Sequence, residues 1–305
     1  MTRRDTVLDR EPSLATAPDI PGPPPGVLFD VGGHRLHLLS MGEQHDGPTV
    51  VLETGATGYS GAWAWIQPAV ASFARVVSYD RAGLGWSAAS TRPHDGLEIG
   101  RQLHTLLQSA GVSGPYVLVG HSLGGMFVRL FAHQYPEDVV GMVLVDAAHP
   151  DQTERYPRYR ELISESQRFF SSRPWENQRL VQLVAADTSD GMPERQAAEI
   201  RAFFSSPRYL TATAAEILAF DTTAAQVRRT RPLGDLPLAV VTAGVGAAEW
   251  PGWADLQAEL AALSSRSTRQ TVAGAAHLNL VTHEQFARSV TEVIRALVED
   301  VRAQR

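Results

Sequence analysis

Short apolar runs alternate along the chain with longer segments in which apolar residues recur every three or four positions. The short runs are rich in β-branched residues and predict strands, whereas the longer segments predict amphipathic helices. Strands that alternate with helices favour a mostly parallel sheet covered by helices, so the sequence predicts the α/β class. The predicted strands are 27–31, 35–40, 49–53, 75–79, 116–119, 141–145, 238–241 and 269–272.

The connection between the first two predicted strands is only long enough for a tight turn. Gly32 and Gly33 stand in it, and paired glycines are typical of two-residue hairpins because both central positions need a positive φ. The sheet is therefore expected to open with an antiparallel pair before it becomes parallel.

The last helical segment carries one apolar stripe at spacings of three and four, which is expected to pack on the sheet. The stripe consists of Phe286, Val290, Val293, Ile294, Leu297 and Val301.

About ninety residues separate the run ending at Val145 from the run beginning at Leu238, where a connection of roughly 2 to 6 residues is common. This stretch has helical but no strand periodicity. It predicts a helical cap over residues 150–232, inserted into a core formed by residues 27–149 and 233–305.

Residues 1–26 are Pro-rich and polar without an apolar h-region, which indicates a flexible leader and a cytoplasmic protein.

Composition excludes several classes of chemistry. The chain has no cysteine and, as its printed sequence shows, no lysine, so a thiol nucleophile, a pyridoxal Schiff base and a Walker-A lysine are ruled out. The net charge of -6 does not favour binding to nucleic acid or to an anionic membrane, because both carry negative charge. We expect no cofactor and no metal, and a small-molecule partner. Oligomeric state is not predicted.

One serine stands where a nucleophile is expected. Ser122 lies in Gly-His-Ser-Leu-Gly, between an apolar strand and a helical segment. A nucleophile on so sharp a strand-to-helix turn needs small residues two before and two after it, because side chains there collide with the neighbouring strand and helix. Gly120 and Gly124 meet this requirement.

With this motif the chain resembles the α/β-hydrolase fold family over residues 27–303, and the segment Asp80 to Ser87 resembles that family's D-R-x-G-x-G-x-S motif. The resemblance implies an eight-stranded sheet with helices on both faces, a cap inserted after the sixth strand, and triad partners in the order Ser, acid, His. It also implies that Asp80 and Arg81 are structural.

A serine needs a base, and the resemblance points to His277, which follows the last predicted strand. His283 is interpreted as a helix-start residue, and His121 is expected to point away from Ser122 into the sheet.

The acid is less clearly marked. The family usually has an Asp shortly after the seventh strand, but this chain has none there before Asp255, which is expected in a helix start. Some members carry the acid at the end of the sixth strand, where Asp146 stands. The sequence favours Asp146, with Glu249 and Asp255 as alternatives.

Two backbone N–H groups are expected to form the oxyanion hole. One belongs to Leu123, after the nucleophile. The other comes from the loop after the third strand, where Thr54-Gly55 replaces the family's His-Gly and makes Ala56 the matching donor, with Gly55 as the alternative.

These residues predict a cofactor-independent serine hydrolase that cleaves an ester, lactone or thioester with an apolar acyl or lactone portion through an acyl-enzyme. A serine at residue 122 argues against haloalkane dehalogenase and epoxide hydrolase, whose nucleophile is an Asp. Two alternatives stay open: a carbon–carbon bond hydrolase with the same triad, and an inactive ligand-binding protein.

Overall fold

The structure, a computed structural model, describes residues 22–172 and 178–304. Most of the predicted leader lies outside these residues. The strands are β1 (Val27–Asp30), β2 (Arg35–Met41), β3 (Thr49–Glu53), β4 (Val76–Tyr79), β5 (Tyr116–His121), β6 (Val139–Val145), β7 (Leu238–Ala243) and β8 (Ser267–Val272). The helices before β7 are η1 (Ser60–Trp63), α1 (Ile66–Val70), α2 (Gly96–Ser109), α3 (Gly124–Gln134), η2 (Pro136–Asp138), α4 (Gln152–Arg155), α5 (Pro157–Ser171), α6 (Gln178–Ser189), α7 (Glu194–Phe204), α8 (Pro207–Leu218) and α9 (Phe220–Arg228). Those after β7 are α10 (Gly244–Glu249), α11 (Trp253–Ala261), α12 (Asn279–Thr282) and α13 (Glu284–Ala303).

All eight strands form one sheet in the order β1-β2-β4-β3-β5-β6-β7-β8. β2 pairs antiparallel with both β1 and β4, and the remaining neighbours are parallel. The predicted antiparallel opening and the α/β class are therefore confirmed. Each predicted strand is found within two residues of its predicted ends.

Helices cover both faces of the sheet, because the central parallel strands are apolar on both sides. One face carries α1 and α13, whose apolar residues join those of β3, β5 and β7 in one core cluster. The other face carries α2, α3 and α11. The predicted stripe of the last helix lies on the first of these faces, with Val290, Ile294 and Leu297 buried against the sheet.

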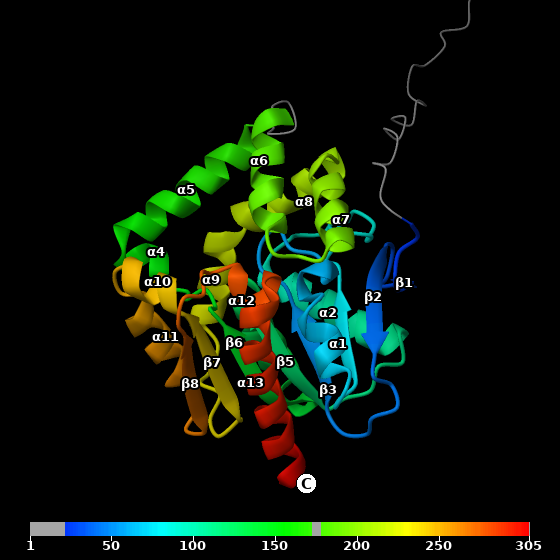
Figure 1. Cartoon of the computed structure of the whole chain (residues 1–305), viewed down its shortest axis with the longest axis vertical. Helices are drawn as coiled ribbons and strands as arrows, with labels where there is room; N and C mark the ends of the chain where they lie inside the picture. Colours follow the sequence, from blue (N-terminus) through cyan, green and yellow to red (C-terminus); the bar gives the residue numbers. More distant parts are fainter. Residues whose placement is uncertain (1–21, 173–177, 305) are drawn as a thin grey trace, which may run out of the picture.

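The segment between β6 and β7 folds as helices α4 to α9, and its described residues contain no strand. Figure 1 shows α5 to α8 standing over the end of the sheet opposite the C-terminus. Residues of α5 to α8, among them Phe203, Phe204 and Tyr209, form a further apolar cluster together with Tyr59 and Leu84 from loops beside the sheet. Within residues 22–172 and 178–304, no helix is both long and apolar enough to cross a membrane.

We predict that α13 contributes strongly to the stability of the core. Ile294→Ala removes a fully buried side chain from the sheet interface and should lower the free energy of unfolding by about 2 to 5 kcal/mol. Glu292→Ala, at an exposed position of the same helix, should change it by less than about 0.5 kcal/mol. Urea denaturation measures both. Equal effects of the two substitutions would contradict the assigned packing.

Candidate active site

Ser122 occupies a tight turn between β5 and α3. Its φ is 53°, in the left-handed region that L-residues with a side chain seldom adopt. A Cβ at Gly120 would lie 2.6 Å from the Gly124 carbonyl oxygen, and one at Gly124 would lie 2.6 Å from the carbonyl oxygens of Glu53 and Thr54. The two glycines therefore allow the turn that presents Ser122 at the edge of the sheet.

Backbone strain is concentrated at this edge. Among the described residues, three that are not glycine have a positive φ: Thr57 at 61°, Ser122 at 53° and Asp146 at 43°. Each such residue costs on the order of 1 to 3 kcal/mol and persists only where the surrounding structure holds it. Thr57 follows β3, Ser122 follows β5 and Asp146 follows β6, so all three lie where neighbouring strands end.

Asp146 and His277 form a close pair. The Nδ1 atom of His277 lies 2.6 Å from Oδ2 of Asp146. The other carboxylate oxygen accepts hydrogen bonds from the Trp253 indole at 2.8 Å and the Ala243 backbone N–H at 3.0 Å. Burial raises the pKa of Asp146, but the contact with His277 and these two donors outweigh burial and lower it below its ordinary value.

The His277 side chain is 41% exposed, whereas Asp146 is buried beneath it. One nitrogen of His277 therefore faces the carboxylate and the ring remains accessible from the other side. The two alternative acids are exposed, Glu249 at the end of α10 and Asp255 in the first turn of α11. Neither forms a hydrogen bond or ion pair with His277 in the described chain.

The expectation that His121 points away into the sheet is wrong. Its Nε2 atom lies 3.1 Å from the carbonyl oxygen of His277, and the two rings are 4.7 Å apart. Because a carbonyl only accepts, Nε2 carries the proton in this contact. The physical reason for the error is that the loop after β8 crosses the end of β5. Burial, with the nearby His277 as a smaller cause, lowers the pKa of His121 to about 3, so the ring is neutral.

His283 begins α13, as expected. The backbone N–H groups of Leu123 and Ala56 find no acceptor among the described residues, and the same holds for Gly55. Gly55 lies directly against Ser122, because a Cβ there would be 2.9 Å from the Cβ of Ser122. The loop after β3 and the first residues of α3 thus present unpaired N–H groups beside Ser122.

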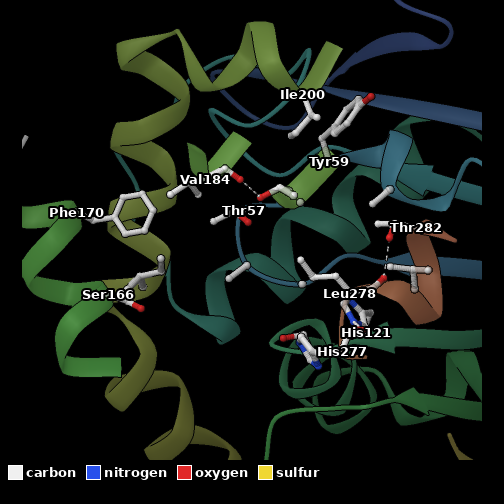
Figure 2. Close-up of a pocket in the computed structure, with 18 of the residues that line it drawn as sticks. Thr57, Tyr59, His121, Ser166, Phe170, Val184, Ile200, His277, Leu278 and Thr282 are labelled. Atoms are coloured by element: carbon white, nitrogen blue, oxygen red, sulfur yellow. Dashed lines mark hydrogen bonds between the residues drawn. The ribbon is translucent and has the colours of Figure 1, made fainter. Parts of the chain in front are cut away.

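Two cavities meet at Ser122 and His277. The larger cavity, of about 480 Å³, lies between the loop after β3 and helices α5 to α7, and Figure 2 shows Phe170, Val184 and Ile200 around it with His277 at its base. The smaller cavity, of about 300 Å³, lies over Leu123 and beneath α5. Its walls include Ile163, Phe220, Trp250 and Trp253. We call them the larger lobe and the smaller lobe.

Both lobes have largely apolar walls. Among the described residues that line them there is no arginine, and the acidic members are Glu165 in the larger lobe and Asp146 in the smaller. No group of three or more potential metal ligands occurs in the described parts of the chain.

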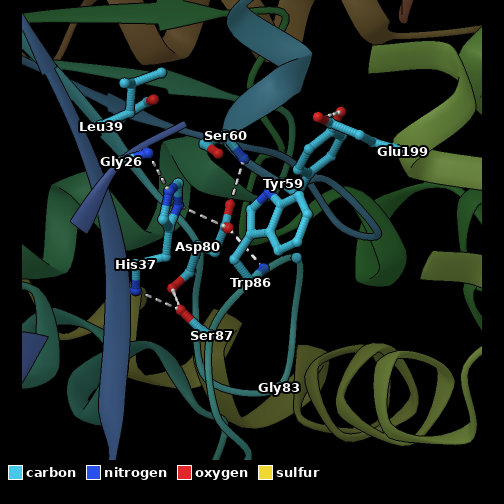
Figure 3. A network of polar contacts seen from close by, with 12 residues as sticks. Gly26, His37, Leu39, Tyr59, Ser60, Asp80, Gly83, Trp86, Ser87 and Glu199 are labelled. Carbon is cyan, nitrogen blue, oxygen red and sulfur yellow. Dashed lines mark hydrogen bonds and ion pairs between the residues drawn. The ribbon is translucent and has the colours of Figure 1, made fainter. Parts of the chain in front are cut away.

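Asp80 anchors the loops behind the larger lobe, in the structural role that the resemblance implied (Figure 3). Its carboxylate lies 3.0 Å from Nδ1 of His37 and accepts from the backbone N–H groups of Ser60 and Trp86. Burial raises the pKa of Asp80, but His37 and the two N–H donors together lower it below its ordinary value. Asp80 therefore remains ionised while fully buried.

The sequence model of the alpha/beta hydrolase fold family matches residues 48–203, just over half of the chain, so the chain belongs to that family. efuK of Hormonema carpetanum, named as a transporter, is 30% identical over 171 residues, 49% of this chain and 25% of that protein. An uncharacterized protein of Schizosaccharomyces pombe is 26% identical over 264 residues, 82% of this chain and 47% of that protein. The chain thus spans less than half the length of these relatives.

The crystal structure of Cfl2 from Burkholderia cenocepacia has the same fold. It matches with a TM-score of 0.72 at 22% sequence identity, over 90% of this chain and 95% of that one. The family that the sequence motifs resembled is therefore the family to which the chain belongs.

We predict a pH signature for buried His121. Its pKa is 6.5 when exposed and about 3 in the folded chain, so between these values the unfolded state binds more protons. Its contribution to stability is complete above pH 6.5 and is lost as the pH falls toward 3. When the pH falls from 7.5 to 5, the free energy of unfolding of the wild type should therefore drop by about 2 kcal/mol more than that of His121→Gln.

Urea denaturation of both proteins at the two pH values measures this difference. His133→Gln, which removes an exposed histidine of α3, controls for the loss of one titratable group. An unchanged pH dependence in His121→Gln would show that His121 is not held neutral.

Proposed function

We propose that the protein is a cofactor-independent serine hydrolase that cleaves a carboxylic ester, lactone or thioester through an acyl-enzyme on Ser122. The observation that carries the proposal is the 2.6 Å contact between His277 and Asp146 at the edge where Ser122 stands on its strained turn. In this proposal α4 to α9 are the cap that closes the site.

In the first half-reaction Ser122 Oγ attacks the substrate carbonyl carbon while His277 Nε2 takes the hydroxyl proton. His277 is suited to this because Asp146 accepts from Nδ1, which leaves Nε2 as the free base. The carboxylate stabilises the imidazolium that forms. His277 then gives the proton to the leaving oxygen or sulfur, and the acyl-enzyme remains.

In the second half-reaction a water molecule attacks the acyl carbon and His277 again takes and returns a proton, which releases the acid and restores Ser122. Both half-reactions develop negative charge on the carbonyl oxygen. The unpaired N–H groups of Leu123 and Ala56 are the proposed donors to that oxygen, each worth roughly 3 to 4 kcal/mol. Leu123 lies at the amino end of α3, where the helix dipole also favours an anion.

The two lobes suggest the class of substrate. Ser122 lines both lobes, so an ester whose carbonyl carbon lies at Ser122 is expected to carry an apolar arm in each lobe. Because no arginine lines either lobe among the described residues, and the chain has no lysine, an anionic arm would be buried without a partner. We therefore propose a neutral substrate with two apolar arms.

Labelling with a fluorophosphonate tests the nucleophile without knowledge of the substrate. The wild type should gain one adduct in intact-mass analysis and Ser122→Ala none.

Asp146→Asn should lower ester turnover by about 10⁴-fold. The matched variants Glu249→Gln and Asp255→Asn should retain turnover within about 2-fold, since both carboxylates are exposed and lie apart from His277. A folded wild type that gains no adduct refutes the proposal.

A matched pair of esters tests the charge of the substrate. p-Nitrophenyl hexanoate and the mono-p-nitrophenyl ester of adipic acid have acyl arms of equal chain length, and only the second ends in a carboxylate. The neutral ester should have a kcat/KM at least about 10-fold higher, because burial of an unpaired charge costs more than the 1.4 kcal/mol that this factor represents. Equal kcat/KM values would contradict the proposed neutral substrate.

A further inference from the structure

Arg81 is buried between the core and the helices that cover the site. Its guanidinium forms a bidentate ion pair with Glu216 of α8, with N–O distances of 2.7 and 2.8 Å. Nη1 lies 2.6 Å from Oε1 of Glu53, at the end of β3. The side chains of all three residues are at most 2% exposed, so solvent does not screen these contacts.

The same guanidinium also holds the loop that follows β3. Nη1 donates to the carbonyl oxygen of Thr54 at 2.9 Å, and Nη2 donates to the carbonyl oxygen of Gly55 at 2.8 Å. Arg81 thus links α8, through Glu216, to the loop that carries Ala56. A bidentate pair with Glu216 fixes the plane of the guanidinium, which fixes the directions in which the other N–H groups donate.

The contact with Gly55 determines how the next N–H is oriented. The Gly55–Ala56 peptide is trans, since the cis peptide of the described chain is Gly114–Pro115. In a trans peptide the carbonyl and the N–H point in opposite directions. With the Gly55 carbonyl directed at Arg81, the Ala56 N–H is turned to the opposite side of the loop, and Ala56 lines both lobes together with Ser122.

Two further contacts join this loop to the covering helices. Tyr209 of α8 donates its hydroxyl to the carbonyl oxygen of Thr57, the strained residue next to Ala56, at 2.5 Å. Tyr59 donates to Glu199 of α7 at 2.9 Å, a contact visible in Figure 3. The loop is therefore held before Ala56 by Arg81, which pairs with α8, and after Ala56 by contacts with α8 and α7.

We propose that Arg81 is a positioning residue for the oxyanion hole: Glu216 of α8 holds its guanidinium, which directs the Gly55–Ala56 peptide so that the Ala56 N–H serves the transition state. The helices over the site thereby control transition-state stabilisation as well as access. This inference rests on the proposed serine hydrolase function and assigns to Arg81 a role beyond the structural one that the family resemblance implied.

The test compares Arg81, which contacts α8 through Glu216, with Arg208, which belongs to α8. Arg81→Lys keeps the positive charge but loses the planar fork that reaches two carbonyl oxygens and a carboxylate together. The matched control is Arg208→Lys. Arg208 lies on α8 and donates to the carbonyl oxygens of Gly83, Gly85 and Ser87, and none of these residues lines either lobe. Both substitutions remove a guanidinium fork from the contact between α8 and the core, where Arg81 is fully buried and Arg208 is half-buried.

Three quantities are measured for each protein: the melting temperature, kcat and KM for p-nitrophenyl hexanoate, and the affinity for a trifluoromethyl ketone. Ser122 Oγ adds to that ketone with transfer of its proton to His277, so the adduct places an oxyanion where the transition state has one. In Arg81→Lys, kcat should fall about 10- to 100-fold and KM should stay within about 2-fold of wild type. This fall in kcat does not exceed the fall expected when one oxyanion-hole donor is removed altogether. The ketone affinity should fall by the same factor as kcat/KM.

Arg208→Lys should lower the melting temperature comparably while kcat and ketone affinity stay within about 2-fold of wild type. If Arg81→Lys does not fold, Glu216→Gln replaces it, because it keeps the shape of the Arg81 partner and removes its charge. A kcat within 2-fold of wild type in the folded variant overturns the inference, as does an equal loss in Arg208→Lys.

Fluorophosphonate labelling of the wild type separates this inference from the proposed function. A labelled wild type with unchanged kinetics in Arg81→Lys overturns the role of Arg81 alone. An unlabelled, folded wild type overturns the serine hydrolase proposal and this inference with it.

Discussion

The parallel register of the central strands fixes where the chemistry of this protein can lie. Glu53 pairs with Gly120 and His121 pairs with Val145, so the chain leaves β3, β5 and β6 at the same edge of the sheet. β7 and β8 end together as well, where Ala243 pairs with Val272. Side chains that are far apart in sequence are therefore neighbours at this edge without any specific attraction between them. The parallel sheet supplies proximity, and the local turns supply orientation.

Orientation is obtained through strained backbone that the neighbouring strands hold in place. The Ser122 N–H donates to the Val145 carbonyl at 3.1 Å, and the Asp146 N–H donates to the Val241 carbonyl at 2.6 Å. The Ala148 N–H returns to the Ser122 carbonyl at 2.9 Å. These bonds link the turns after β5 and β6 to each other, so neither residue can relax to an ordinary φ alone. The strain is thus held at Ser122 and Asp146, the residue that pairs with His277.

Features that depend on local sequence could be predicted from it, and those that depend on long-range packing could not. The strands, the hairpin at Gly32 and the turn at Ser122 follow from patterns a few residues long, and the structure has each of them. The preference for Asp146 over Glu249 rests on the family resemblance, since some members carry the acid at the end of the sixth strand, and the structure pairs Asp146 with His277. His121 was misjudged, and Trp253 as a donor to Asp146 was not foreseen, because both depend on contacts with loops more than 100 residues away. No periodicity marks such contacts.

The cluster around Arg81 is hard to explain by stability alone. Three ionisable side chains lose their water there, and burial is the largest influence on Glu53, whose pKa is raised even with Arg81 beside it. Apolar residues of similar volume often hold a helix to a core as well as a buried ion pair does, or better. An apolar contact, however, cannot direct two consecutive carbonyl groups, whereas a guanidinium fixed by a bidentate carboxylate can. The desolvation cost is therefore understandable if the position of the loop after β3, and not only the attachment of α8, is what the cluster maintains.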